Sequence, residues 1–235
     1  VFHNFTLLHD DIMDRSDMRR GKPAVHTRWN DNVAILSGDA MMIWAYRLLS
    51  QCDEAVLPQL LAVFTDVAVG VCEGQQYDMD FESRDDVTVE EYLRMIELKT
   101  AVLLAGALKI GALCGGAEPV QAELLYRFGI DLGMAFQLQD DLLDTYGDPA
   151  VFGKPVGGDI LVGKKTYLLT TALKAADAPT RARLLALLHD AEMASGEKIA
   201  AVRSVYDSLA VRQTAERAVA SYFDEARQVL SLIHI

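Results

Sequence analysis

The sequence is poor in cysteine and has no recognisable cysteine or histidine motif. Its 235 residues include only three cysteines, Cys52, Cys72 and Cys114, whose spacing fits no zinc site. The five histidines are scattered and form no metal-binding pair. Because the number of cysteines is odd and no metal spacing appears, we expect a reduced, cytoplasmic protein.

Positive charge is also scarce. The chain has 22 lysines and arginines against 34 aspartates and glutamates, which gives a net charge of −12. This balance argues against a nucleic-acid partner, since such partners are held mainly through their phosphates. It also makes a concentrated anionic substrate unusual, unless metal ions reverse the local charge.

Long apolar runs are missing as well. No uninterrupted run reaches the roughly 18 residues that a membrane span requires. The longest candidate, residues 101–116, is interrupted by Lys109. We therefore expect no membrane span. The chain also opens on Val1 inside a helical pattern, without Met or a capping residue, so we expect that an N-terminal portion precedes it in the complete protein.

Strand-like alternation is absent, and the apolar residues recur at helical spacing. Thr88 and Glu91 form a capping box that begins one of the helices. The pattern predicts an all-α fold with a single domain over residues 1–235. The expected helices cover residues 1–15, 31–50, 58–77, 88–95, 98–113, 119–144, 164–174, 179–194, 197–209 and 211–230, with loops at 16–30, 84–87 and 147–158.

Two acidic clusters of the same form stand on these apolar helices. They read Asp10-Asp11-x-x-Asp14 and Asp140-Asp141-x-x-Asp144. The outer aspartates of each cluster are four residues apart and share a helix face. A buried, unpaired carboxylate costs several kcal/mol, so a cation must neutralise it. Oxygen ligands without cysteine or histidine suit Mg²⁺. A solvated acidic face is the alternative, and it explains one cluster better than two.

Further polar residues accompany the clusters. Arg19 and Arg20 follow the first and can bind phosphate oxygens in bidentate fashion. Gln137 precedes the second, and its spacing predicts one polar stripe with Asp140, Asp141 and Asp144. The remaining candidates are Gln75 with Asp78, the Lys99-Thr100 pair, and Lys154 and Lys164 in and after the glycine-rich loop. Taken singly, each of these residues can equally be an ordinary surface side chain.

In combination, these motifs resemble the trans-isoprenyl diphosphate synthases, also called polyprenyl synthetases. The resemblance covers most of residues 1–170. It rests on the two aspartate motifs and on Gly74-Gln75-x-x-Asp78, Lys99-Thr100, Phe152-Gly153-Lys154 and Gly163-Lys164, which occur in the family's order. It implies an isoprenoid synthase-type helical bundle around a central cavity, a homodimer, and three Mg²⁺ ions that hold an allylic diphosphate for condensation with isopentenyl diphosphate.

The resemblance also assigns roles to individual residues. Asp10 and Asp14 would hold two ions and Asp140 the third, with Asp11 and Asp144 in support. Arg20 would contact isopentenyl diphosphate, and Gln75 and Asp78 would lie in the substrate site. The allylic diphosphate would be contacted by Arg19, Lys99, Thr100, Gln137, Lys154 and Lys164, of which Arg19 and the three lysines would assist catalysis.

Phe5 bears on the length of the product. It lies five residues before Asp10, about 7.5 Å below it on a helix, where a growing prenyl tail would descend. In the family, a bulky residue near this position limits the tail. Phe5 beside the smaller Thr6 resembles geranylgeranyl synthases more than farnesyl synthases. The alternative is that Phe5 is an ordinary core residue.

The chain departs from the family at both ends. An upstream Gly-Lys-x-x-Arg segment and a histidine that bind isopentenyl diphosphate are not in this sequence, and residues 231–235 replace the usual last helix. The resemblance therefore implies a fragment whose metal and allylic sites are intact. Two alternatives remain open, although a class I terpene cyclase would normally carry a different second motif and a non-catalytic subunit usually loses an aspartate cluster. A di-iron bundle would need Glu-x-x-His pairs, and the chain has none.

Overall fold

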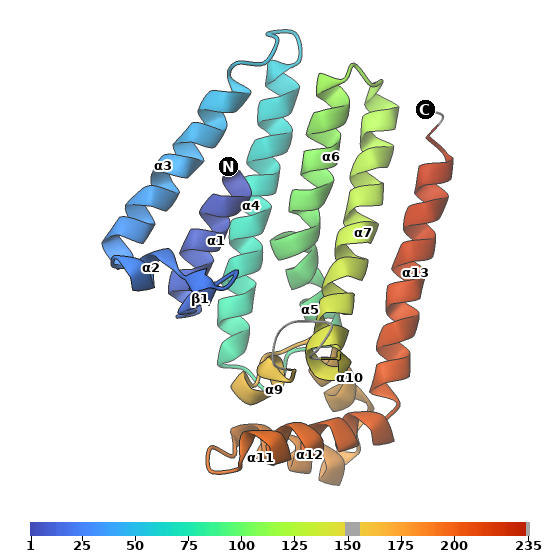
Figure 1. The fold of residues 1–235 in the computed structure, drawn as a ribbon. Helices are drawn as coiled ribbons and strands as arrows, with labels where there is room; N and C mark the ends of the chain where they lie inside the picture. The colour runs from blue at the N-terminus through green and yellow to red at the C-terminus, as the bar shows by residue number, and fades with distance from the viewer. Residues whose placement is uncertain (149–155, 234–235) are drawn as a thin grey trace.

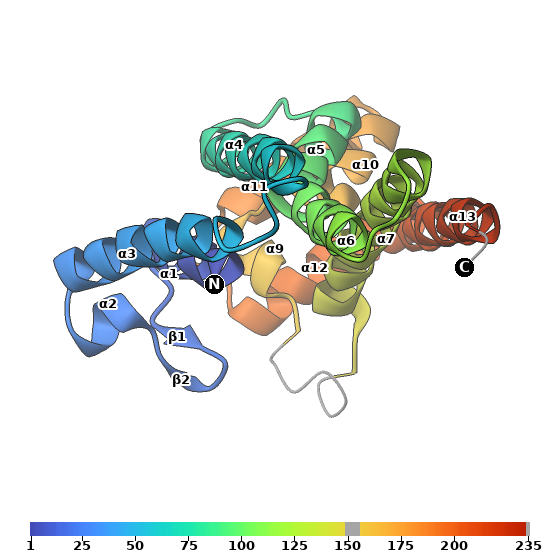
Figure 2. The same ribbon diagram turned by 90° about the horizontal axis from the view of Figure 1, so that it is seen from above.

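The computed structural model describes residues 1–148 and 156–233, and these form a bundle of helices (Figure 1). The long helices α3, α4, α6, α7 and α13 lie side by side, and the short helices α9 to α12 cluster at one end of them. Neighbouring helices in this row contact one another across the molecule (Figure 2). The described elements are α1 (Phe2–Met13), β1 (Met18–Arg19), β2 (Lys22–Pro23), α2 (Val25–Arg28), α3 (Asp31–Leu49), α4 (Leu57–Glu82), α5 (Val89–Ile96), η1 (Glu97–Ala101), α6 (Val102–Cys114), α7 (Pro119–Tyr146), α9 (Gly158–Val162), α10 (Tyr167–Ala175), α11 (Ala178–His189), α12 (Ser195–Ser208) and α13 (Val211–Ser231).

Local capping chemistry explains several helix ends. The predicted capping box is confirmed at α5, where the Glu91 N–H donates to Thr88 Oγ1 at 3.1 Å and the Thr88 N–H donates to the Glu91 carboxylate at 2.8 Å. Asn30 caps α3 by accepting a hydrogen bond from the Val33 N–H at 2.9 Å. Pro119 opens α7 at a position where no backbone donor is needed.

The prediction that residues 16–30 form a loop without strands is wrong. This segment contains the antiparallel ladder of β1 with β2 and the single-turn helix α2. The turn between the strands uses positive φ angles at Arg20 (+53°) and Gly21 (+74°). Two strands of two residues are too short to produce the alternation that identifies a strand in a sequence.

Several other predicted boundaries also differ. The helix expected from residue 164 begins at Tyr167, because the Thr166 side chain caps it by accepting from the Leu169 N–H. Residues 158–162 form the unpredicted helix α9, and α11 ends at His189 rather than at 194. The break predicted between the helices 88–95 and 98–113 is not present: Glu97–Ala101 form the π-helical turn η1, and the chain stays helical from Val89 to Cys114.

The core forms where helices approach closely. The largest apolar cluster joins residues of α5, α7, α10, α12 and α13, and a second joins α1, α3, α4, η1 and α6. At Gly129 and Gly133 of α7, a Cβ atom would collide with the backbone of Ala105 and Ala101. At Gly74 of α4, it would collide with the backbone of Lys99. Glycine at these positions therefore fixes how deeply η1 and its neighbours pack together.

Helix α4 also meets the length and hydropathy requirements for crossing a membrane, which we did not expect from the sequence. This finding is weak evidence for a span, since the core helix of a globular bundle meets the same requirements. Phe64, Val67 and Val71 on α4 lie in the second apolar cluster.

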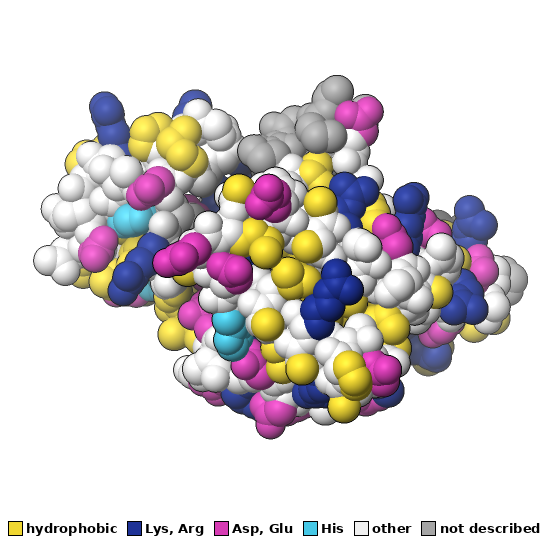
Figure 3. All heavy atoms as spheres, turned by 90° about the horizontal axis from the view of Figure 1, so that it is seen from below, with side chains coloured by type: hydrophobic (Ala, Val, Ile, Leu, Met, Phe, Trp, Pro, Cys, Tyr) yellow, Lys and Arg dark blue, Asp and Glu magenta, His cyan; other side chains and the backbone are white. Residues whose placement is uncertain are grey.

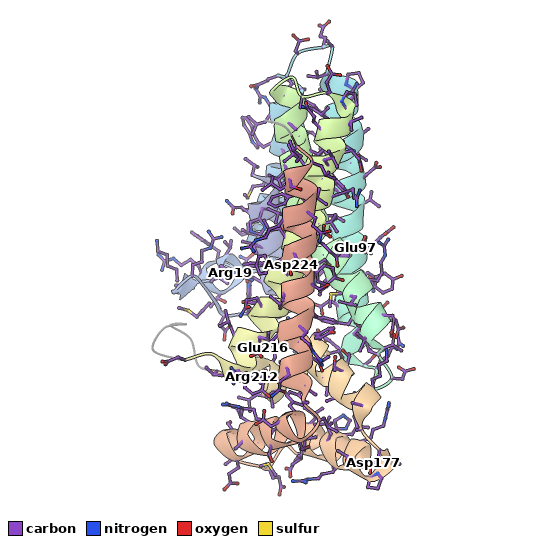
Figure 4. The ribbon with its side chains drawn as sticks, turned by 90° about the vertical axis from the view of Figure 1, so that its right-hand side faces the viewer. Arg19, Glu97, Asp177, Arg212, Glu216 and Asp224 are labelled. Atoms are coloured by element: carbon purple, nitrogen blue, oxygen red, sulfur yellow. The ribbon has the colours of Figure 1, made fainter. Side chains whose placement is uncertain are left out.

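The outer surfaces are mixed in character. Acidic, basic and apolar side chains are interspersed on the end formed by the short helices (Figure 3). On α13, Arg212 and Glu216 lie one turn apart (Figure 4) and pair at 2.8 Å. An exposed pair of this kind adds only a few tenths of a kcal/mol.

Candidate functional site

The predicted site residues gather at the end of the bundle where α1, α4 and α7 finish (Figure 1). Asp14 is the C-terminal cap of α1, Asp78 lies near the end of α4, and the second aspartate cluster ends α7. Lys164, which follows α9, interacts electrostatically with Asp14, Asp78 and Asp141. Residues far apart in the sequence are thus brought within range of one ammonium group.

Asp10 is the centre of the first cluster. Its carboxylate lies 3.2 Å from Lys99 Nζ and 3.6 Å from an Arg19 nitrogen. The atom paired with Lys99 is the buried Oδ1, which accepts no hydrogen bond within the described residues although the ammonium group lies beside it. Burial, followed by repulsion from Asp10, raises the pKa of Asp14. A cation placed between these two carboxylates would relieve this repulsion.

Asp11 is oriented differently from its neighbours. Only 3% of the residue is exposed, and it accepts a hydrogen bond from Arg19 Nε at 2.8 Å. Hydrogen bonding to Asp11 raises the pKa of Arg19 despite partial burial. Asp11 therefore holds the β1 arginine against the end of α1, and any support it gives to a metal ion passes through this pair.

The second cluster divides in the same way, so the prediction of a single polar stripe is wrong for Asp141. This middle aspartate is 3% exposed and accepts hydrogen bonds from the Tyr92 hydroxyl at 2.5 Å and the Tyr167 N–H at 3.0 Å. Burial raises the pKa of Asp141 to about 6, although its hydrogen bonds oppose that change. Asp140 is exposed, whereas Asp144 is half-buried and accepts a hydrogen bond from the Asp159 N–H at 3.1 Å.

Asp159 and Lys164 form a further charged pair. Lys164 was predicted as a site residue, and Asp159 was not. Burial raises the pKa of Asp159 to about 7; Lys164 opposes this rise, and Asp144, Asp141 and Asp140 add to it. Lys164 keeps some exposed surface although protein atoms crowd its ammonium group. Burial lowers its pKa, but Asp159 and the other carboxylates outweigh that effect, so the pKa is raised and Lys164 stays charged.

The turn η1 carries Lys99 and Thr100. Lys99 Nζ donates to Asp78 at 2.6 Å, and Thr100 Oγ1 donates to Gln137 Oε1 at 3.2 Å. Gln137 Nε2 in turn donates to Asp141 at 3.3 Å. A hydrogen-bonded chain therefore runs from Thr100 of η1 across α7 to the buried aspartate, while Lys99 is held by Asp78 and Asp10.

The remaining predicted residues are placed as follows. Gln75 lies on the same stretch of α4 as Asp78, and its Nε2 atom is buried with no partner among the described residues. Arg20 is exposed in the turn of the β-hairpin. Phe5 is half-buried, with its ring 5.5 Å from the ring of Phe2 and 4.8 Å from that of His9. Lys154 lies outside the described residues.

No group of three or more potential metal-ligating side chains converges within residues 1–148 and 156–233. The carboxylates of Asp10 and Asp14 still present the donors that Mg²⁺ prefers, namely oxygen atoms without nitrogen or sulfur. The repulsion between these two carboxylates, which contributes to the raised pKa of Asp14, fits such an ion.

Asp159 leads to a prediction about pH. Because its folded pKa of about 7 exceeds that of an unfolded aspartate, near 3.9, the folded chain binds more protons between these values. Its contribution to stability therefore falls as pH rises from about 4 to 7. Asp159→Asn should raise the free energy of unfolding by about 1 kcal/mol or more at pH 8 and far less at pH 4. Urea titrations of the metal-free protein with a chelator present measure this; equal effects at both pH values would contradict it.

Comparisons with known proteins identify the family and the fold. Residues 1–207 match the family described as Polyprenyl synthetase. A short chain isoprenyl diphosphate synthase of Methanothermobacter thermautotrophicus is 46% identical over 80% of this chain, and the chain spans 58% of that protein's length. One solved structure, a geranylgeranyl pyrophosphate synthase, superposes with a TM-score of 0.94 at 46% identity, covering 100% of this chain and 72% of that one.

A second solved structure is a geranylgeranyl pyrophosphate synthase of Corynebacterium glutamicum in complex with isoprenyl diphosphate and magnesium. It superposes with a TM-score of 0.88 at 30% identity, covering 100% of this chain and 71% of that one. The predicted all-helical fold of the isoprenoid synthases is therefore confirmed. From its sequence, its fold and the order of its motifs, this chain belongs to the polyprenyl synthetase family.

Proposed function

We propose that this chain carries the active site of a prenyltransferase that condenses an allylic diphosphate with isopentenyl diphosphate to give a short-chain product. The observation that carries the proposal is the meeting of Lys99 and Lys164 with carboxylates of α1, α4 and α7 at one end of the bundle. A diphosphate can bind both to lysine ammonium groups and to cations that carboxylates hold, and this end of the bundle offers both.

Magnesium is part of this proposal. Asp10 and Asp14 would hold two ions and Asp140 a third, with Asp144 and the Asp11–Arg19 pair in support. The repulsion between Asp10 and Asp14 supports this assignment, as does the magnesium complex of the related synthase. When bound, Mg²⁺ neutralises the charge that develops on a departing diphosphate.

The chain's own residues then have defined tasks. Lys99, Lys164 and Arg19 donate hydrogen bonds to the departing diphosphate, and Lys154 joins them. Thr100 and Gln137, which are hydrogen-bonded to each other, contact the allylic diphosphate and help to fix its position. Arg20 and the Gln75–Asp78 stretch lie toward the second substrate. Donors that meet charge only as it develops lower the barrier to ionisation.

The carbon chemistry follows from ionisation. The C–O bond of the allylic diphosphate breaks, and the double bond of isopentenyl diphosphate attacks the allylic cation. A proton then leaves to the departed diphosphate, and a new alkene remains. Water would quench the cation, so the apolar cluster below Asp10, which includes Phe2 and Phe64, serves to keep the tail region dry.

The decisive experiment is product analysis with the complete protein that contains this chain. It is incubated with farnesyl diphosphate, isopentenyl diphosphate and Mg²⁺, and the products are sized by mass spectrometry. A prenyl diphosphate longer by one or more five-carbon units supports the proposal. A hydrocarbon made from farnesyl diphosphate alone would indicate a cyclase, and the absence of any product would indicate a non-catalytic subunit. A chelator should abolish turnover, and added Mg²⁺ should restore it.

Phe5 is proposed to limit the product. Its ring packs half-buried with Phe2 and His9, one and a half turns before Asp10. Phe5→Ala should shift the main product upward by at least one five-carbon unit, because the tail gains the volume of the ring. Phe5→Tyr keeps the ring and should leave the product distribution unchanged. The same product from Phe5→Ala as from the wild type would remove Phe5 from this role.

A homodimer is also part of the proposal, and the outer face of α3 supports it. Large apolar side chains are exposed along this helix, including Leu36 (68% exposed), Ile43 (69%) and Trp44 (50%). The opposite face of α3 packs on α1, the helix with the first aspartate cluster (Figure 2). A continuous exposed apolar stripe of this kind is typical of a protein interface. A cytoplasmic location is consistent with the three free thiols.

Introducing charged residues into this apolar stripe tests whether it forms the dimer interface. The double variant Leu36→Lys with Ile43→Lys should shift the protein from dimer to monomer in sedimentation velocity and raise the dissociation constant at least 100-fold, since two buried anchors become charged. Val120→Lys is the matched control, because Val120 is 72% exposed on α7, away from α3. A dimer that persists in the double variant would place the interface elsewhere.

A further inference from the structure

Cys52 and Cys114 are far apart in the sequence but meet at one end of the bundle. Cys52 lies in the connection between α3 and α4, and Cys114 is the last residue of α6. Both places are at the end of the long helices opposite the aspartate clusters (Figure 1). The side chains of the two cysteines interact with each other.

The backbone holds both thiols in place. Cys52 is half-buried against the apolar cluster of Leu60, Leu113 and Ala122, and Leu113 directly precedes Cys114. The Cys52 N–H donates to the Leu49 carbonyl at 3.0 Å, which ties it to the end of α3. Cys52 thus packs against the cluster that contains Leu113, the residue next to Cys114.

Their accessibility is unequal. Cys114 is exposed, whereas Cys52 is shielded on one side by the cluster. The third cysteine, Cys72, lies in the middle of α4, and it is also exposed. A small oxidant in solution can therefore reach Cys114 or Cys72, but only Cys114 has a second thiol beside it.

We propose that Cys52 and Cys114 form an intramolecular disulfide when the protein meets a small-molecule disulfide such as oxidised glutathione. The Cys114 thiolate attacks one sulfur of the oxidant, forms a mixed disulfide and releases one reduced glutathione. The Cys52 thiolate then attacks the Cys114 sulfur and expels the second. Two protein thiols are oxidised, one disulfide is reduced to two thiols, and the protons pass to the products.

Burial raises the pKa of Cys114, and the neighbouring Cys52 thiol raises it further. The thiolate that starts the exchange is therefore scarce at neutral pH, and the bond should form faster as pH rises. In a reducing compartment both side chains stay thiols. The pair thus responds to oxidising conditions without being a constitutive structural disulfide.

The bond would join the α3–α4 connection to the end of α6. It would close a loop of about 60 residues, and a cross-link of that size is expected to raise the midpoint of thermal unfolding by roughly 10 °C. The cross-link lies at the end of the bundle opposite the aspartates. It would therefore stabilise the bundle and restrain α3, the helix that carries the apolar stripe.

The test maps the bond directly in the wild-type protein. The complete protein is incubated with oxidised glutathione at pH 8, its remaining thiols are alkylated, and a non-reduced digest is analysed by mass spectrometry. We expect one linked peptide pair through Cys52 and Cys114 within a single chain, with Cys72 alkylated. The melting midpoint should rise by roughly 10 °C and return to its original value with dithiothreitol.

Cys52→Ser and Cys114→Ser should each abolish the rise, and Cys72→Ser should keep it. Any of three results would overturn the proposal: alkylation of both Cys52 and Cys114, a stable glutathione adduct on Cys114 beside an alkylated Cys52, or a cross-link between two chains.

Discussion

Asp10→Asn should lower the turnover of an allylic diphosphate by roughly a factor of 10³, the loss typical for removing one strong electrostatic partner from a reacting charge. The substitution keeps the shape of the side chain and removes its charge. Asp10 Oδ1 lies 3.2 Å from Lys99 Nζ, so both the proposed ion and the lysine lose their common partner. The rate is measured in the complete protein with labelled isopentenyl diphosphate at saturating Mg²⁺.

Asp224→Asn is the matched control for this experiment. Asp224 is an exposed aspartate on α13 (Figure 4), far along the chain from both clusters. It should leave the rate unchanged while removing the same charge. Turnover by Asp10→Asn within tenfold of the wild type, with an unchanged circular dichroism spectrum, would show that Asp10 is not part of the reacting site.

Asp141→Ala should lower the free energy of unfolding by about 3 kcal/mol. The Tyr92 hydroxyl and the Tyr167 N–H both donate to this one carboxylate inside the core, and alanine leaves both donors without an acceptor. Asp141→Asn retains a side-chain oxygen for these donors and should cost only about 1 kcal/mol. Urea denaturation at pH 7.5 measures both changes.

The comparison of the two variants separates hydrogen bonding from charge. Equal losses for alanine and asparagine would mean that the negative charge, rather than the acceptor oxygen, stabilises the core at this point. A loss below about 0.5 kcal/mol for Asp141→Ala would contradict the structural role altogether, since surface substitutions commonly have effects of that size.

Much of the helical frame follows from local chemistry and could be predicted. The capping box at Thr88 and the proline that opens α7 act within one turn of the chain, so their sequence signals are sufficient. The hairpin after α1 and the turn η1 depend on tertiary contacts instead. The amino-acid sequence of η1 does not indicate that Gly74 lets the backbone of Lys99 approach α4 so closely.

The site could be predicted only in part, because it too depends on both local spacing and tertiary contacts. Helical spacing correctly places the outer aspartates of each cluster on a shared face, but it does not show which carboxylates turn inward. Asp11 and Asp141, the middle aspartates, are each 3% exposed and serve as acceptors for Arg19 and for Tyr92 with Tyr167. Those partners lie 8 to 49 residues away along the chain, beyond the reach of any local pattern. Asp159 was missed because a single acidic residue in a glycine-rich segment has no distinctive spacing.

The turn η1 is a single π-helical turn within the otherwise α-helical segment from Val89 to Cys114. A π turn accommodates one residue more than an α turn, so the helical phase after it is offset by about 100°. This extra residue sets the rotation of Lys99 and Thr100 relative to the apolar side chains of α5. An insertion or deletion in this segment would rotate every side chain that follows it, whereas a substitution would leave these directions unchanged.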